Sequence, residues 1–169
     1  MKILHTAAVL GVLVAGLVVP SASVAAEAAV PAPCTNAELK ASYHRTDAGM
    51  SHRYGKLVLT NVSDHACRTG GYGGLSYVGG GDGTQVGAPA DREPGKVRSI
   101  VVHPGEKVVS VVSETDATVY PRRECRRAAV DGFRVYLPNQ TESQYVAHPT
   151  TGCRDDGVHL LSHQAYRHA

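Results

Sequence analysis

Short runs in which apolar and polar residues alternate are the main pattern along this chain. Between residues 54 and 89, runs rich in Val, Leu and Tyr are separated by Gly, Asn, Asp and Ser. Such runs, bounded by turn-forming residues, are typical of β-strands. Gly or Pro interrupts every candidate helix, and no window keeps a 3.6-residue period. The pattern predicts an all-β chain, an antiparallel β-sandwich of about seven to nine short strands, with a small barrel as the alternative.

The N-terminal half of this pattern predicts two strands, residues 39–43 and 55–61, joined by a polar loop over residues 44–53. In the second strand Leu57 and Leu59 share the inward face, because side chains alternate along a strand. Val58 lies between them, and we expect it to face outward.

Glycines divide the next segment. The glycine-rich sequence of residues 70–74 predicts a bulge or a close approach of two backbones, because runs of glycine weaken the interior of a strand. Gly79–Gly83 predicts a hairpin turn between strands over residues 75–78 and 84–87. A loop, Ala88–Lys96, follows.

The clearest predicted hairpin joins residues 97–102 to residues 107–113 through the turn His103-Pro104-Gly105-Glu106. Pro and Gly stand there in the two central positions of a type II turn. Ser110 is the only polar residue in the centre of the second run, so we expect that strand to be covered on both faces.

The C-terminal part is predicted to begin with a long polar connection over residues 114–127. Phe133, Val135 and Leu137 then alternate with polar residues in an amphipathic strand. The last two predicted strands are residues 145–147 and 158–161.

The first 25 residues have the three parts of a secretory signal: Lys2, an uncharged apolar stretch over residues 7–19, and small residues up to Ala25. The apolar stretch is shorter than the roughly 18 residues that a spanning helix needs. We therefore expect cleavage after Ala25, an Ala/Pro-rich flexible leader over residues 26–33 and one exported, soluble domain over residues 34–169. An uncleaved anchor is the alternative.

Composition narrows the classes of function. The charge is nearly balanced, with 17 Lys and Arg against 15 Asp and Glu, so no nucleic-acid partner is expected. The chain has no Trp, and Phe133 is its only Phe, so the core depends on Val, Leu, Ile and Tyr.

Four cysteines, an even number in a chain with a secretory signal, indicate two disulfides. The chain-entropy estimates for the three possible pairings differ by only about 1 kcal/mol and do not decide between them. The predicted strand order places Cys34 near Cys67 and Cys125 near Cys153. We therefore expect this sequential pairing.

The candidate chemistry is sparse. Three histidines near the C-terminus, His159, His163 and His168, suggest a metal site, but strand geometry spreads the first two too far apart for one ion. Ser63-Asp64-His65 has the residue types of a catalytic triad, yet consecutive residues cannot adopt its geometry. Gly79–Gly83 lacks the following helix of a phosphate-binding loop. We expect no catalytic site, no metal and no cofactor.

A basic cluster flanks the third cysteine and is the candidate patch for an anionic ligand. It consists of Arg122, Arg123, Arg126 and Arg127. With Gly79–Gly83 and Ala88–Lys96, it is one of three loops where we expect recognition to take place.

Several segments together resemble a family. A cysteine followed by G-x-L-V-L-T-N-x-S-x-x-x-C, then G-Y-G-G-L-S-Y-V, then F-R-V-Y-L-P at residues 133–138, is similar to the secreted actinobacterial domain-of-unknown-function family 4232. The resemblance extends from Cys34 to Leu161. It implies an exported immunoglobulin-like sandwich with two disulfides and transfers no functional residues.

These observations favour an exported, non-enzymatic module that binds an anionic cell-envelope polymer or an extracellular protein. The alternatives are an inhibitor of secreted proteases, which would use the segment around Cys125, and a small hydrolase or metal-binding protein.

Overall fold

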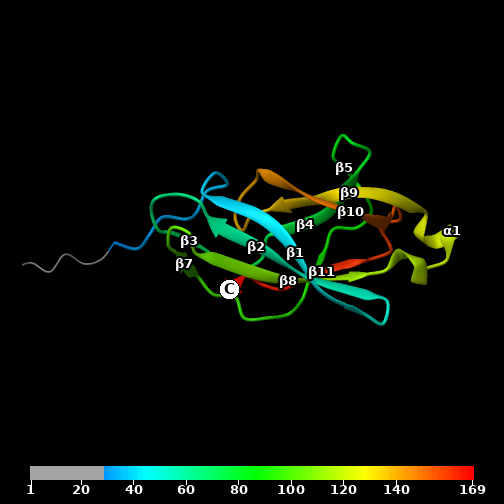
Figure 1. Cartoon of the computed structure of the whole chain (residues 1–169), viewed down its shortest axis with the longest axis horizontal. Helices are drawn as coiled ribbons and strands as arrows, with labels where there is room; N and C mark the ends of the chain where they lie inside the picture. Colours follow the sequence, from blue (N-terminus) through cyan, green and yellow to red (C-terminus); the bar gives the residue numbers. More distant parts are fainter. Residues whose placement is uncertain (1–28) are drawn as a thin grey trace, which may run out of the picture.

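The computed structural model describes residues 29–169, which form an all-β sandwich (Figure 1). The predicted signal peptide and the start of the leader lie outside the described residues. The strands are β1 (Leu39–Gly49), β2 (His52–Asn61), β3 (Cys67–Thr69), β4 (Gly74–Gly79), β5 (Thr84–Gln85), β6 (Asp91–Arg92), β7 (Ile100–Val102), β8 (Lys107–Thr115), β9 (Arg127–Tyr136), β10 (Ser143–Cys153), β11 (Leu161–His163) and β12 (Arg167–His168). Two single-turn helices, η1 (Ala117–Val119) and α1 (Arg122–Cys125), join β8 to β9.

Two main sheets build the sandwich. One has the strand order β1-β2-β8-β11-β6, with β12 also paired to β8, and the other has the order β10-β9-β4-β5. A small third sheet contains β3 and β7. All pairings between these strands are antiparallel except the one between β11 and β6. The predicted fold class is confirmed, but the predicted number of strands is too low, because several strands have only two or three residues.

The core lies between the two main sheets. Leu57 and Leu59 of β2 and Phe133 and Val135 of β9 are all buried in it, as the alternation predicts. Val58 is also buried, but it does not belong to the core cluster that contains Leu57 and Leu59. The Gln144 side chain joins the edge strands β1 and β10 by accepting from Ala41 N (2.9 Å) and donating to Leu39 O (2.6 Å).

The prediction of a polar loop over residues 44–53 is wrong. β1 and β2 form one long hairpin in which Gly49 pairs with His52, and Met50 and Ser51 make the turn with φ of 49° and 65°. Both faces of its outer half are largely exposed, so the polar residues carry no alternation that could reveal a strand.

The prediction that residues 97–102 and 107–113 pair as a hairpin is also wrong. Its turn forms, with Glu106 N donating to His103 O (2.9 Å) and Gly105 at φ 77°. However, β7 pairs with β3, whereas β8 pairs with β2 and β11. The turn therefore carries the chain from one sheet to another, and β8, a central strand, accounts for the apolar run on both of its faces.

The end of the chain differs in detail from the prediction. Residues 114–127 are not simply a polar connection: β8 continues to Thr115, with Glu114 fully buried, and two short helices follow. β10 runs to Cys153, and β11 begins at Leu161, where the predicted strand ended.

Both disulfides have the predicted sequential pairing. Cys34 is bonded to Cys67 and Cys125 to Cys153, with Cα atoms 4.8 and 4.6 Å apart.

The predicted close approach of two backbones in the glycine-rich stretch, residues 70–74, is also confirmed. At Gly70, at φ 138°, a Cβ would lie 2.0 Å from the carbonyl oxygen of Arg98, so the backbone of the 93–99 segment passes directly against it.

Candidate functional site: a cationic cleft beside the C-terminal strand

The four predicted arginines do not form one surface patch. The Arg127 guanidinium donates to the carbonyl oxygens of Ala117 (3.2 Å), Thr118 (3.0 Å) and Tyr120 (3.1 Å), and so holds the turn around η1. Carbonyl groups in such a turn need hydrogen-bond donors from elsewhere, because they do not take part in the backbone hydrogen bonds of a β-sheet. Arg127 is therefore a structural residue.

Arg126 is also engaged, in an ion pair with Asp155 (2.9 Å). Arg122 and Arg123 are exposed on α1, next to the exposed carboxylate of Glu124. Of the predicted patch, only these two arginines project into solvent without an ion-pair partner among the described residues. The segment that they occupy is helical rather than extended.

The other two predicted loops have different roles. In the Gly79–Gly83 turn, Gly81 N donates to the Asp131 carboxylate (2.8 Å), which fixes the turn against β9. The Ala88–Lys96 segment includes β6 and ends at the edge of a cleft beside the C-terminal strand.

The histidines are scattered. The His159 ring bonds the exposed carboxylate of Asp91 (2.9 Å), and His163 is buried, with its ring against that of Tyr72. The His65 ring contacts Asp64 and Glu38, whereas the Ser63 hydroxyl donates to the side-chain oxygen of Asn61 and to the backbone carbonyl oxygen of His65. Within residues 29–169 no group of three or more His, Cys, Asp or Glu side chains is arranged to hold a metal ion.

A buried polar cluster that the sequence did not reveal lies between the sheets. Glu114 on β8 accepts hydrogen bonds from the hydroxyls of Tyr43 (2.6 Å) on β1 and Tyr77 on β4. His148 on β10 approaches the same carboxylate at 2.8 Å. Phe133 stacks on the His148 ring, with centroids 4.5 Å apart, and completes the layer.

This cluster is part of the core. Burial alone would raise the pKa of Glu114, but the hydrogen bonds from His148, Tyr43 and Tyr77 outweigh it and hold that pKa below its usual range. Glu114 has no solvent exposure and His148 has 7%, so a substrate would have to displace packed side chains. The cluster joins four strands from both sheets.

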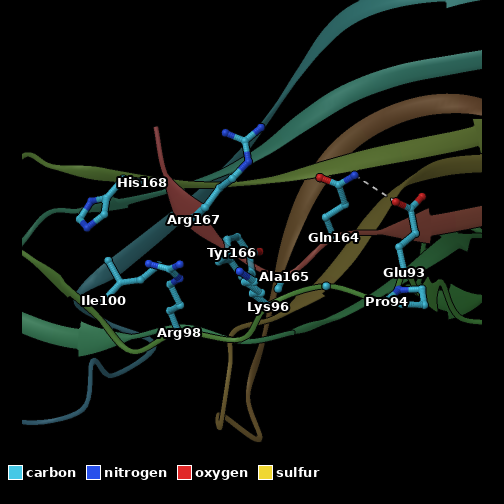
Figure 2. Close-up of a pocket in the computed structure, with 11 residues that line it drawn as sticks. Glu93, Pro94, Lys96, Arg98, Ile100, Gln164, Ala165, Tyr166, Arg167 and His168 are labelled. Atoms are coloured by element: carbon cyan, nitrogen blue, oxygen red, sulfur yellow. Dashed lines mark hydrogen bonds between the residues drawn. The ribbon is translucent and has the colours of Figure 1, made fainter.

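The cleft of interest, about 580 Å³ in volume, lies between residues 93–100 and the C-terminal strand β12 (Figure 2). Ile100, Ala165 and Tyr166 are its buried apolar side chains. The Tyr166 hydroxyl is buried and has no hydrogen-bond partner in the described structure. The cleft therefore combines an apolar floor with polar groups around it.

Basic side chains line this cleft. Lys96 and Arg98 are exposed on the segment before β7, and Arg167 and His168 belong to β12. In Figure 2 the Lys96 and Arg98 side chains rise toward the C-terminal strand, whereas the Arg167 guanidinium lies on the other side of that strand. Lys96 and Arg98 are thus the cations best placed to contact a ligand, and Arg167 adds positive charge at the rim.

Glu93, the acidic residue that lines the cleft, already accepts hydrogen bonds from within the protein. Glu93 accepts from the Ser162 hydroxyl (2.7 Å) and from the Gln164 amide (3.1 Å). Neither Lys96 nor Arg98 forms an ion pair with any acid of residues 29–169. Their charges remain available to an external anion.

No local signal in the sequence marks this cleft. Lys96 and Arg98 stand about 70 residues before Arg167. The pairing of β12 with β8, the bridge between Gly71 and Tyr166 and the hydrogen bond from Glu93 N to His163 O bring the two segments together. The Ala88–Lys96 loop was one of the expected recognition sites, and only its last residues reach the cleft.

The fold and cleft together define a disulfide-stabilised β-sandwich with a cationic surface site. The sequence matches a family described as a domain of unknown function, DUF4232, over residues 34–165. The chain belongs to this family. Among curated proteins and among solved structures there is no match. In the part of the chain from residue 29 onward, no helix has the length and apolar character needed to cross a bilayer.

Proposed function

We propose that this protein is an exported, non-enzymatic binding module that holds an anionic polymer of the cell envelope in the cationic cleft. The observation that carries the proposal is a concave site with two exposed cations, Lys96 and Arg98, that have no acidic partner in the described structure. Export is supported by the N-terminal signal pattern and by two disulfides, which persist in oxidising compartments.

The chemistry of the two cations suits phosphate or carboxylate groups. The Arg98 guanidinium can donate two parallel hydrogen bonds to one such group, and the Lys96 ammonium adds a mobile point charge. The apolar floor at Ile100 and Tyr166 offers contact area to the carbon backbone between charged groups.

Two variants with equal change of charge test the location. In the cleft variant, Lys96→Ser is combined with Arg98→Ser, and in the loop variant Arg122→Ser is combined with Arg123→Ser. All four residues are exposed, so both variants should fold. An oligo(glycerol phosphate) and an oligogalacturonate serve as the phosphate and carboxylate probes, and binding is measured by isothermal titration calorimetry.

The cleft variant should lose at least about tenfold in affinity, since one charge-assisted hydrogen bond is worth roughly 1.5–3 kcal/mol. The loop variant should stay within about twofold of the wild type. Wild-type affinity should fall by about an order of magnitude between roughly 50 and 200 mM salt if two anionic groups are contacted. The proposal is wrong if neither probe binds, or if the loop variant loses affinity and the cleft variant does not.

A further inference from the structure

A second cleft lies on the other main sheet, on the face turned away from the core. Its volume is about 530 Å³, and Tyr145, Asp131, Val78, Gly81 and Gly83 line it. Tyr145 of β10 stands next to Val146, which packs against the core, so the Tyr145 side chain points to the opposite face. Tyr145 is 61% exposed, which is unusual for a large aromatic residue on a sheet.

The Tyr145 ring is held in one place. Its hydroxyl donates to the carbonyl oxygen of Asp131 (2.9 Å). The ring also covers Gly132, where a Cβ would come within 2.7 Å of the ring carbon Cε2. A fixed, exposed ring is a flat apolar surface that costs little conformational entropy when a ligand stacks on it.

The opposite wall consists of backbone. Gly81 and Gly83 have φ of 74° and 79°, a region that residues with a Cβ rarely adopt. A Cβ at Gly81 would meet no atom within 4 Å. Open space therefore adjoins this glycine, and the hydrogen bond from Gly81 N to Asp131 Oδ2 keeps the turn in position.

The polar groups at the cleft and the adjoining hollow balance in charge. Asp131 presents its second carboxylate oxygen, Oδ1, which has no hydrogen bond from the described residues. Arg134 borders the hollow that continues from the cleft along β10, together with the exposed Ser143. Arg134 also donates to the carbonyl oxygen of Gly83. One negative and one positive group beside an aromatic plane suit an uncharged ligand with many hydroxyl groups.

We infer that this second cleft, walled by Tyr145 and by the Gly81–Gly83 turn, binds a neutral saccharide. The C–H face of a pyranose ring stacks on Tyr145, while Asp131 accepts and Arg134 donates hydrogen bonds to its hydroxyls. The inference does not rest on the cationic cleft. That cleft shares none of these residues, and its proposed ligand is anionic rather than neutral.

The competing explanation is that Tyr145 only shields the backbone at Gly132, as aromatic residues do beside glycine in sheets. Two substitutions separate these roles. Tyr145→Leu keeps an apolar cover over Gly132 but removes the flat ring. Tyr145→Phe keeps the ring and removes only the hydroxyl.

The test is a titration followed by amide NMR spectra, with β1,4-linked glucose, N-acetylglucosamine and mannose tetrasaccharides as probes. At least one should shift the amides of Gly81, Gly83 and Gly132, with a dissociation constant of about 1 mM, as expected for a shallow cleft. Tyr145→Leu should weaken that binding at least about tenfold, and Tyr145→Phe should stay within about threefold of the wild type.

Tyr54→Leu is the matched control, because Tyr54 is an exposed tyrosine on β2 in the other main sheet. It should leave saccharide binding unchanged. The inference is overturned if none of the three probes shifts these amides, or if the tightest of them binds Tyr145→Leu as well as the wild type. It is equally overturned if Tyr145→Phe loses as much affinity as Tyr145→Leu, since the hydroxyl would then account for the whole effect and the aromatic plane for none of it.

Discussion

The arginine loop around Cys125 and the cationic cleft beside β12 both concentrate positive charge, but they reach that state in opposite ways. In the loop the four arginines are close in sequence, and two of them are bonded within the protein: Arg127 to three carbonyl oxygens and Arg126 to Asp155. In the cleft, Lys96 and Arg98 lie close together on one segment, and Arg167 adds charge at the rim from another; Lys96 and Arg98 have no acidic partner in the described structure. The loop lies at the α1 end of the molecule, and β7, which borders the cleft, lies towards the other end (Figure 1).

Charge density along a sequence is therefore a poor guide to charge that a ligand can use. A tight turn leaves carbonyl oxygens without partners, and a nearby arginine satisfies them at little entropic cost. Cations without acids or carbonyls close by remain available at the surface. What matters for binding is the number of cations that the fold leaves unpaired.

The largest expected effect within this comparison is on stability, at Arg127. Arg127→Ala removes the donors of three turn carbonyls and should lower the free energy of unfolding by about 1–3 kcal/mol. Arg122→Ala, at an exposed position on α1, is the control and should change that free energy by less than about 0.5 kcal/mol.

Urea unfolding of the two variants beside the wild type measures this difference. Equal stabilities for Arg127→Ala and Arg122→Ala would show that the hydrogen bonds of Arg127 contribute nothing, and the arginine loop would then be as available to ligands as the cleft.

A smaller effect should separate the two regions by pH. His163, at the end of β11, is buried. Burial and the nearby charge of Arg92 lower its pKa from the ordinary value of 6.5, while the backbone of Gln164 and the charge of Glu93 act in the other direction. Because the unfolded chain binds the proton more readily, the stability from neutral His163 is complete above pH 6.5 and is lost as the pH falls toward the lowered pKa.

Hydrogen exchange at about pH 7.5 and about pH 5.5, on either side of the ordinary histidine pKa, checks this prediction. The amides of β11 and β12 should lose more protection on acidification than those of β9 beside the arginine loop, and His163→Gln should reduce that difference. His159→Gln is the control, since His159 is exposed. Equal loss of protection in both regions, or no effect of His163→Gln, would contradict it.

The sequence predicts the parts of this structure that depend on local pattern. The alternation around Phe133, the turn at Pro104-Gly105 and the sequential disulfides are all as expected. The strand partners were not predictable in the same way. A turn between two apolar runs looks the same whether the runs pair with each other or, as β7 and β8 do, with strands elsewhere.

The sites illustrate the same limit. Glu114 looks like the start of a polar connection, yet it is buried because three partners from other strands satisfy it. The sequence pointed to the arginines because they are close neighbours, and it could not show which of them the turn would use. The cleft depends on contacts between segments about 70 residues apart, which no local pattern records.

Mapping the anionic ligand on the protein tests directly whether the fold leaves its usable charge in the cleft. Amide NMR spectra of the wild type, titrated with the oligo(glycerol phosphate) at low salt, should shift mainly at residues 95–100 and 164–168. Shifts confined to residues 122–127, or spread evenly over all exposed basic residues, would contradict this account.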